Sequence, residues 1–192
     1  HYPPPFGGIA SHIRDLVSVL KVTKCKSHVL SFSDKNFTKN VDGAVLYSRK
    51  NAISFSVIKT ICNNPIKFIS AISMMPKFGI KNFYFHLSSI LKAILVAELV
   101  DKNLPDSITI YGSRDGAIIP FLDVLRPGNK INYCVFADMY TREDFYSENE
   151  VLYQNAITTS NKIFASSSFC SKSIRNLNKH IEPYVIYIGV DT

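Results

Sequence analysis

Short apolar runs alternate with helix-length stretches along the chain, and this order restricts the fold more than any other feature. The runs are β-branched and aromatic: 28–33, 43–48, 107–112, 131–137, 162–167 and 184–189. Such runs are typical of strands buried on both faces of a parallel sheet. The stretches between them, at 8–22, about 54–75, 83–102, 115–125, 142–159 and 169–179, are expected to be helical. The order predicts an α/β fold with a Rossmann-like, doubly wound, mostly parallel sheet flanked by helices, in one domain over residues 1–192.

Local signals support several of these helices. Asn64 stands as an N-cap before Pro65 at the first helical position, and Thr141 with Asp144 is close to a capping box. The apolar run 90–100 is too short to span a membrane and contains Lys92 and Glu98. We therefore expect this run to be a helix packed on the core.

Composition excludes disorder, because 46% of the residues are hydrophobic and only 19% are charged. The cysteines Cys25, Cys62, Cys134 and Cys170 are far apart and lack the paired spacing of a zinc or redox motif. Four buried thiols in a reducing cytoplasm are favoured, and two disulfides are the alternative.

Charge is unevenly distributed. Residues 1–100 hold 13 Lys/Arg and 4 Asp/Glu, whereas residues 101–192 hold 9 and 11. This asymmetry predicts one positive face for phosphate groups, an anionic bilayer or nucleic acid. No nucleic-acid motif accompanies it, so we do not expect nucleic acid as a partner.

A glycine pair, Gly7 and Gly8, precedes the first expected helix. Glycine lets the backbone approach a ligand closely, and a helix N-terminus favours anions. The pattern is not G-x-G-x-x-G, so a dinucleotide site is weakly indicated. A plain tight turn is the alternative.

Five segments in series resemble the N-terminal domain of GT-B glycosyltransferases of the family-4-like group. They are "HYPPPFGGIASHIRDL", "PDSITIYGSRDGAIIPFL", "NKINYCVFADMY", "NAITTSNKIFASSSFCSKSI" and "EPYVIYIGVDT", and they cover the chain in the family's order. The resemblance implies a retaining hexosyltransferase that uses a nucleotide-sugar donor, without a bound metal or cofactor. This chain would be its acceptor-binding half, and the C-terminal donor domain would lie beyond Thr192.

The resemblance also implies a cellular role and a strand upstream of His1. Family members build capsule and other surface polysaccharides on glycan or lipid-linked acceptors, which places the protein in the cytoplasm, with the inner face of the membrane as a peripheral site. The upstream strand would lie between the runs 28–33 and 107–112. We therefore expect the isolated chain to be inactive and poorly stable.

The first helix contributes four expected site residues. By the resemblance, Gly7 and Gly8 form the loop that faces the donor diphosphate. Ser11 and His12 in the following turns would contact the acceptor, although a histidine packed against the neighbouring strand is an equal reading.

The other expected site residues follow two later strands. The family often has histidine where this chain has Ala137, so Asp138 is the catalytic candidate, with capping of the next segment as the alternative. Arg142 would meet an acceptor phosphate or lie in solvent. Arg114 and Asp115 are acceptor-binding candidates at a strand's carboxyl end, or a local ion pair.

A basic, apolar segment completes the candidates. Residues 43–100 carry seven Lys/Arg and one acid, and Lys67, Lys77 and Lys81 stand there among Ile, Phe and Met. Such a segment can lie on an anionic leaflet, or it can be an ordinary helix with its lysines in water. Two other functions stay open: a non-catalytic basic domain that binds polyanions or membrane, and a sugar-nucleotide epimerase of similar architecture.

Overall fold

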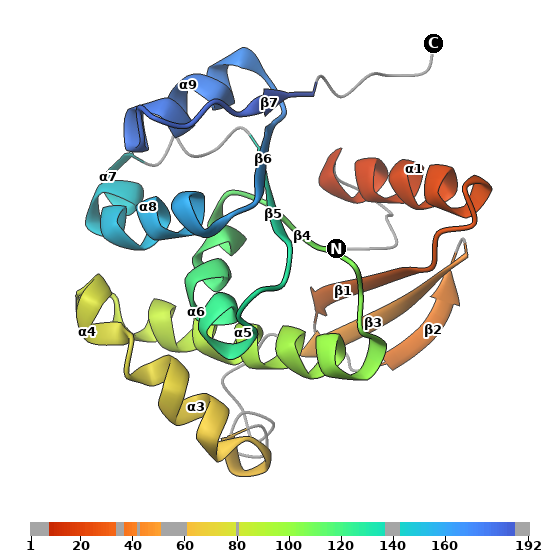
Figure 1. Ribbon diagram of the computed structural model, residues 1–192, viewed down its shortest axis with the longest axis horizontal. Helices are drawn as coiled ribbons and strands as arrows, with labels where there is room; N and C mark the ends of the chain where they lie inside the picture. The colour runs from red at the N-terminus through yellow and green to blue at the C-terminus, as the bar shows by residue number, and fades with distance from the viewer. Residues whose placement is uncertain are drawn as a thin grey trace. The chain divides into compact units, whose positions relative to one another are not determined.

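The chain forms two compact units in a computed structural model, residues His1–Ile58 and Lys59–Thr192 (Figure 1). The structure describes residues 8–33, 37–41, 43–50, 61–79, 81–136 and 143–186. The prediction that the whole chain is one domain stays a prediction.

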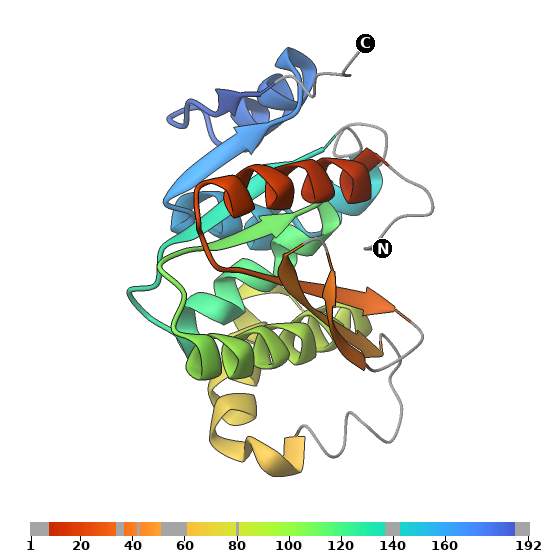
Figure 2. The same ribbon diagram turned by 90° about the vertical axis from the view of Figure 1, so that its right-hand side faces the viewer.

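The first unit is a helix and a three-stranded sheet, visible in Figure 2. Its elements are α1 (Gly8–Val22), β1 (Ser27–Ser33), β2 (Phe37–Val41) and β3 (Ala44–Lys50). β3 is central, parallel to β1 and antiparallel to β2. α1 packs on β1, and Val17 of α1 is buried together with Leu46 and Tyr47 of β3. α1 has the bounds that the helical spacing predicts.

The second unit contains a four-stranded sheet in the order β4-β5-β6-β7, with every neighbouring pair parallel. Its strands are β4 (Ile108–Tyr111), β5 (Ile131–Val135), β6 (Lys162–Ala165) and β7 (Tyr184–Val185). Its helices are α3 (Pro65–Ile72), α4 (Met75–Phe78), α5 (Phe83–Asn103), the 3-10 helix η1 (Arg114–Ile118), α6 (Ile119–Leu125), α7 (Glu143–Glu148), α8 (Glu150–Thr159) and α9 (Ser168–Leu177). Fully buried Phe121, Tyr133 and Tyr153 lie in the core between helices and sheet. The predicted α/β fold class, with a parallel sheet flanked by helices, is confirmed.

α5 is the central helix of the second unit. It packs against α3, η1 and α6, and Ile90, Ala93, Ile94 and Ala97 are fully buried. Among the described helices, α5 is long and apolar enough to cross a membrane, but half of that stretch is buried inside the protein. The prediction of a core helix over this run is therefore confirmed.

The structure corrects several local predictions. β2 was not expected, because its sequence FTKNV is polar and its three middle residues are exposed. The expected helix 142–159 divides at Asn149, and Thr141 lies outside the described residues. Asn64 does hold the N-cap position of α3, but its side chain makes no capping hydrogen bond. All four cysteines are free, as favoured, yet Cys25 and Cys62 are exposed rather than buried.

Candidate functional site

The candidate site is the edge of the second unit's sheet at which its parallel strands end. We call carboxyl-end edge the residues that follow three strands there, namely 112–115 after β4, Phe136 after β5, and Ser166 and Ser167 after β6. Ligands of open α/β sheets bind at this edge, because the loops and helix N-termini there leave backbone groups unpaired.

The turn after β4 is held rigidly. Gly112 has a φ of 103°, which favours glycine, and its N–H donates to the Cys134 carbonyl at 3.0 Å. The buried Ser113 donates its hydroxyl proton to the Phe136 carbonyl, which joins the ends of β4 and β5. The Tyr133 hydroxyl donates to the Ser113 carbonyl at 2.5 Å. The backbone therefore presents the next two residues in a fixed orientation.

Those two residues are Arg114 and Asp115, both predicted from the sequence. Arg114 is exposed, its carbonyl accepts the Tyr153 hydroxyl at 3.0 Å, and its guanidinium carbon lies 5.5 Å from the centre of the Phe85 ring. Asp115 forms an ion pair with Lys92 of α5 at 2.8 Å. A guanidinium held on an aromatic ring presents a planar fork of donors, which suits a carboxylate or a phosphate.

The turn after β6 adds a helix N-terminus to the same edge. The Ser167 hydroxyl caps α9 by accepting the Cys170 N–H at 3.2 Å, and the Ser166 N–H donates to the Val135 carbonyl at 3.1 Å. α9 has no acidic residue in its first turn. Its dipole therefore favours a negative group at this end.

Two titratable groups near the edge stay neutral. Burial, with a smaller contribution from Cys170, raises the pKa of the Cys134 thiol to about 12. Burial, with a smaller contribution from Cys134, raises the pKa of the Tyr111 hydroxyl to about 12. Neither group is ionised near pH 7, so neither supplies a nucleophile or a general base.

A buried histidine, His86, fixes the junction between α7 and α8. Its Nε2 lies 3.2 Å from Oδ1 of Asn149, the N-cap residue of α8, and both side chains are 1% exposed. Burial lowers the pKa of His86, against the opposing effect of hydrogen bonds to Asn149 and Gly79. Asp138 and Arg142, two of the predicted site residues, lie outside the described residues.

Of the remaining predicted residues, Lys67, Lys77 and Lys81 belong to the second unit, and those at the start of the chain belong to the first. Gly8 is the first residue of α1, and Ser11 and His12 are half-buried in its first turns. The first turn of α1 contains no acidic side chain, so its dipole also favours an anion. Gly7 lies outside the described residues.

Sequence reasoning missed the groups that hold this site in place. Lys92, Tyr133, Tyr153 and His86 act through contacts between elements far apart in the chain, and no motif marks them. The serine-rich turn before α9 was visible as a signal for Ser167. Among the described residues, no group of three His, Cys, Asp or Glu side chains is placed to hold a metal ion.

Comparison with known proteins identifies the fold. No protein-family model and no curated protein matches the chain. An apo structure of OtsA is similar in fold, with a TM-score of 0.57, 13% identity, and coverage of 100% of this chain and 48% of that one. A structure described as trehalose-6-phosphate from E. coli bound with UDP-2-fluoro glucose gives a TM-score of 0.54 and 14% identity, covering 94% of this chain and 41% of that one.

This chain thus spans less than half the length of the structures it matches. At such low identity the likeness shows the fold alone. That fold is a Rossmann-like domain of the GT-B type found in OtsA.

Proposed function

We propose that this chain is the acceptor-binding domain of a retaining GT-B glycosyltransferase, which transfers a sugar from a nucleotide-sugar to a glycan or lipid-linked acceptor in surface polysaccharide synthesis. The observation that carries the proposal is the match of the whole chain to under half of an OtsA structure. The second similar structure is bound with UDP-2-fluoro glucose, which supports a nucleotide-sugar as the donor class.

In this proposal the candidates from the sequence keep the roles that the family resemblance implies. Gly7 and Gly8 allow the backbone at the start of α1 to approach the donor diphosphate, whose charge the helix dipole stabilises. Ser11 and His12 contact the acceptor. Asp138 orients the reacting hydroxyl, which is a contribution from positioning rather than from a covalent intermediate.

The carboxyl-end edge supplies the acceptor contacts. Arg114, exposed and stacked on Phe85, pairs with an anionic group of the acceptor, and Arg142 provides a second cation for it. Asp115 is partly neutralised by Lys92, so its carboxylate accepts a hydrogen bond from a sugar hydroxyl without repelling a phosphate strongly. The reaction needs no resident metal or cofactor, and it takes place in the cytoplasm.

The test is a transfer assay on the full-length product of the native gene, with a panel of nucleotide-sugars and lipid-linked acceptors. We expect product from one donor, and Arg114→Gln should raise the KM for the acceptor more than it lowers kcat. Arg175→Gln is the matched control, because Arg175 pairs with Glu182 on the exposed part of the second unit. Absence of transfer from every donor, or equal acceptor KM for both variants, would contradict the proposal.

A further inference from the structure

In α3, two large apolar side chains face solvent and the lysine faces the protein, which is the reverse of an ordinary surface helix. The residues on one side of this helix and of the turn before it, at spacings of three and four, are all exposed: Cys62, Ile66, Ile69 and Ser73. We call them the outer face of α3. Ile66 is 79% exposed and Ile69 is 64% exposed, so two large apolar side chains one turn apart lie in solvent.

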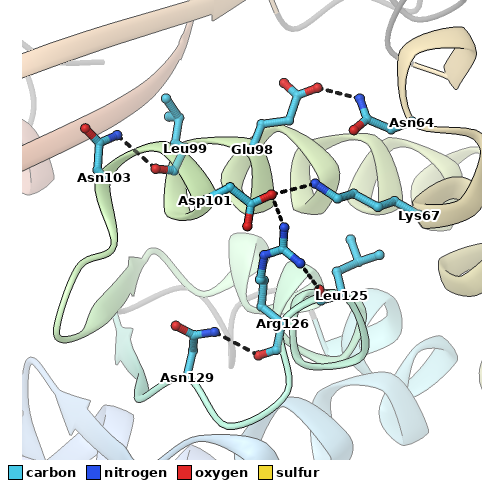
Figure 3. Close-up of polar contacts among 9 residues, drawn as sticks. All are labelled: Asn64, Lys67, Glu98, Leu99, Asp101, Asn103, Leu125, Arg126 and Asn129. Carbon is cyan, nitrogen blue, oxygen red and sulfur yellow. Dashed lines mark hydrogen bonds and ion pairs between the residues drawn. The ribbon is translucent and has the colours of Figure 1, made fainter.

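The polar side chains of this helix point inward instead, as Figure 3 shows. Lys67 forms an ion pair with Asp101 of α5 at 2.8 Å, and Arg126 pairs with the same carboxylate. Asn64 donates to Glu98 of α5 at 2.5 Å.

These contacts attach α3 to α5 and α6 without using Ile66 or Ile69. An amphipathic surface helix normally buries its apolar residues and exposes its charges. The outer face is therefore spare apolar surface that the fold of this unit does not use.

The segment that carries the outer face is basic in sequence. Residues 59–97 of the second unit contain no aspartate or glutamate, and Lys77 in α4 and Lys81 just after it are exposed. Lys67 does not extend into solvent with them, because it pairs with Asp101 of α5. Exposed apolar side chains on the same segment as exposed lysines complement an anionic lipid surface better than they complement a protein patch of mixed charge.

We propose that the outer face of α3 binds an anionic bilayer, with Ile66 and Ile69 inserted at the acyl boundary and Lys77 and Lys81 on the headgroups. The contact does not depend on sugar transfer and goes beyond the proposed function. It assigns the surface to two isoleucines and two lysines, and it removes Lys67 from the three lysines that the sequence indicated. Lys67 serves to attach the helix.

The experiment is co-sedimentation of the whole chain with vesicles of phosphatidylglycerol and phosphatidylcholine, and with phosphatidylcholine alone. We expect binding to the anionic vesicles, weakened by salt. The double variant Ile66→Ser/Ile69→Ser should bind about tenfold less, because it removes the inserted apolar area. Lys77→Glu/Lys81→Glu should bind at least about tenfold less, since each lysine near the surface contributes roughly fivefold.

Matched controls come from the rest of the chain. Val19→Ser/Val22→Ser replaces two exposed apolar residues on α1, and Lys172→Glu/Lys179→Glu makes the same change of charge on and after α9. The valine pair should bind like the wild type, and the charge control should lose less than Lys77→Glu/Lys81→Glu.

Three results would overturn the proposal. One is wild-type chain that does not sediment with anionic vesicles. The second is equal binding by the Ile66→Ser/Ile69→Ser variant and the valine control. The third is a dimer in light scattering that the isoleucine variant abolishes while vesicle binding is unchanged, because the outer face would then bind a second copy of the chain. Circular dichroism checks that each variant is folded. Loss of folding is unexpected, because the substituted residues are exposed.

Discussion

Replacement of Gly116 by alanine is expected to destabilise the second unit, although the added atom is one methyl group. A Cβ at this position would lie 2.2 Å from both Cζ and Oη of Tyr133 and 2.8 Å from its Cε2. Tyr133 is fully buried in β5, and its hydroxyl is bonded to the Ser113 carbonyl. The buried ring would have to shift away from position 116, and such a shift would strain that hydrogen bond.

The magnitude follows from two opposing effects. Alanine in place of glycine at an unstrained helical position normally stabilises by about 0.4–1 kcal/mol, since the unfolded chain loses freedom. Overpacking a core costs about 1–3 kcal/mol, and the loss of the hydrogen bond from Tyr133 costs about 0.5–1.5 kcal/mol more, since the Gly116 N–H still donates to the Ser113 carbonyl. The free energy of unfolding should therefore fall by about 2 kcal/mol, which reverses the usual sign.

The assay is urea unfolding followed by circular dichroism at constant temperature, for the wild type, Gly116→Ala, Tyr133→Ala and the double variant. If the clash causes the loss, Gly116→Ala should cost far less in the Tyr133→Ala background, where the ring is gone. A Gly116→Ala midpoint equal to that of the wild type would refute the packing described for η1 and β5. So would the same loss in both backgrounds.

Three further outcomes are expected. If the proposed sugar transfer is right, Gly8→Val in the full-length protein should lower turnover strongly at nearly unchanged stability, because a β-branched side chain would block backbone approach to the donor diphosphate. An unchanged rate in steady-state assays would mean that the loop is only a turn. Burial lowers the pKa of His86 in the folded state, so its neutral form should stabilise the fold fully above the unfolded pKa of about 6.5. This stabilisation should be lost as the pH falls toward the lower folded pKa. When the pH is lowered from about 7.5 to 5.5, the urea midpoint should therefore decrease less for His86→Gln than for the wild type. Asp101→Asn should lower the free energy of unfolding by about 1 kcal/mol, because Lys67 and Arg126 then face each other without a counter-charge. This loss should become smaller in high salt, and a loss that does not depend on salt would contradict the account.

The order of elements was predictable because the strands of the second unit have short β-branched and aromatic sequences, of which β5 is the most buried. Such short runs favour strands over helices, and Gly112, Gly128 and Pro183 mark turns near three of them. β2 escaped prediction for the opposite reason: its pairing with β3 comes from the backbone, and its exposed middle residues carry no apolar pattern. The break at Asn149 is also a tertiary effect, because the buried contact with His86 holds this residue outside helical geometry.

The position of the candidate site was predictable to the same extent. Arg114 and Asp115 follow a strand directly, and parallel strands bring their carboxyl ends to one edge whatever the details of packing. Their partners were not predictable. Lys92 lies on α5, which precedes the strand, and Tyr153 lies on α8, which comes after β5 and α7, so only the folded chain brings them to the turn.

The lysines of residues 67–81 show why net charge alone does not identify a binding surface. The segment counts as basic throughout, but Asp101 and Arg126, from α5 and the end of α6, decide which of its cations reaches solvent. Because successive residues on a helix are separated by about 100°, Ile69 lies on roughly the opposite side of α3 from Lys67. The inward ion pair of Lys67 is therefore consistent with the exposure of Ile69. By composition this segment is charged. At the outer face of α3, however, the exposed surface is apolar, and the exposed lysines Lys77 and Lys81 follow it in the chain.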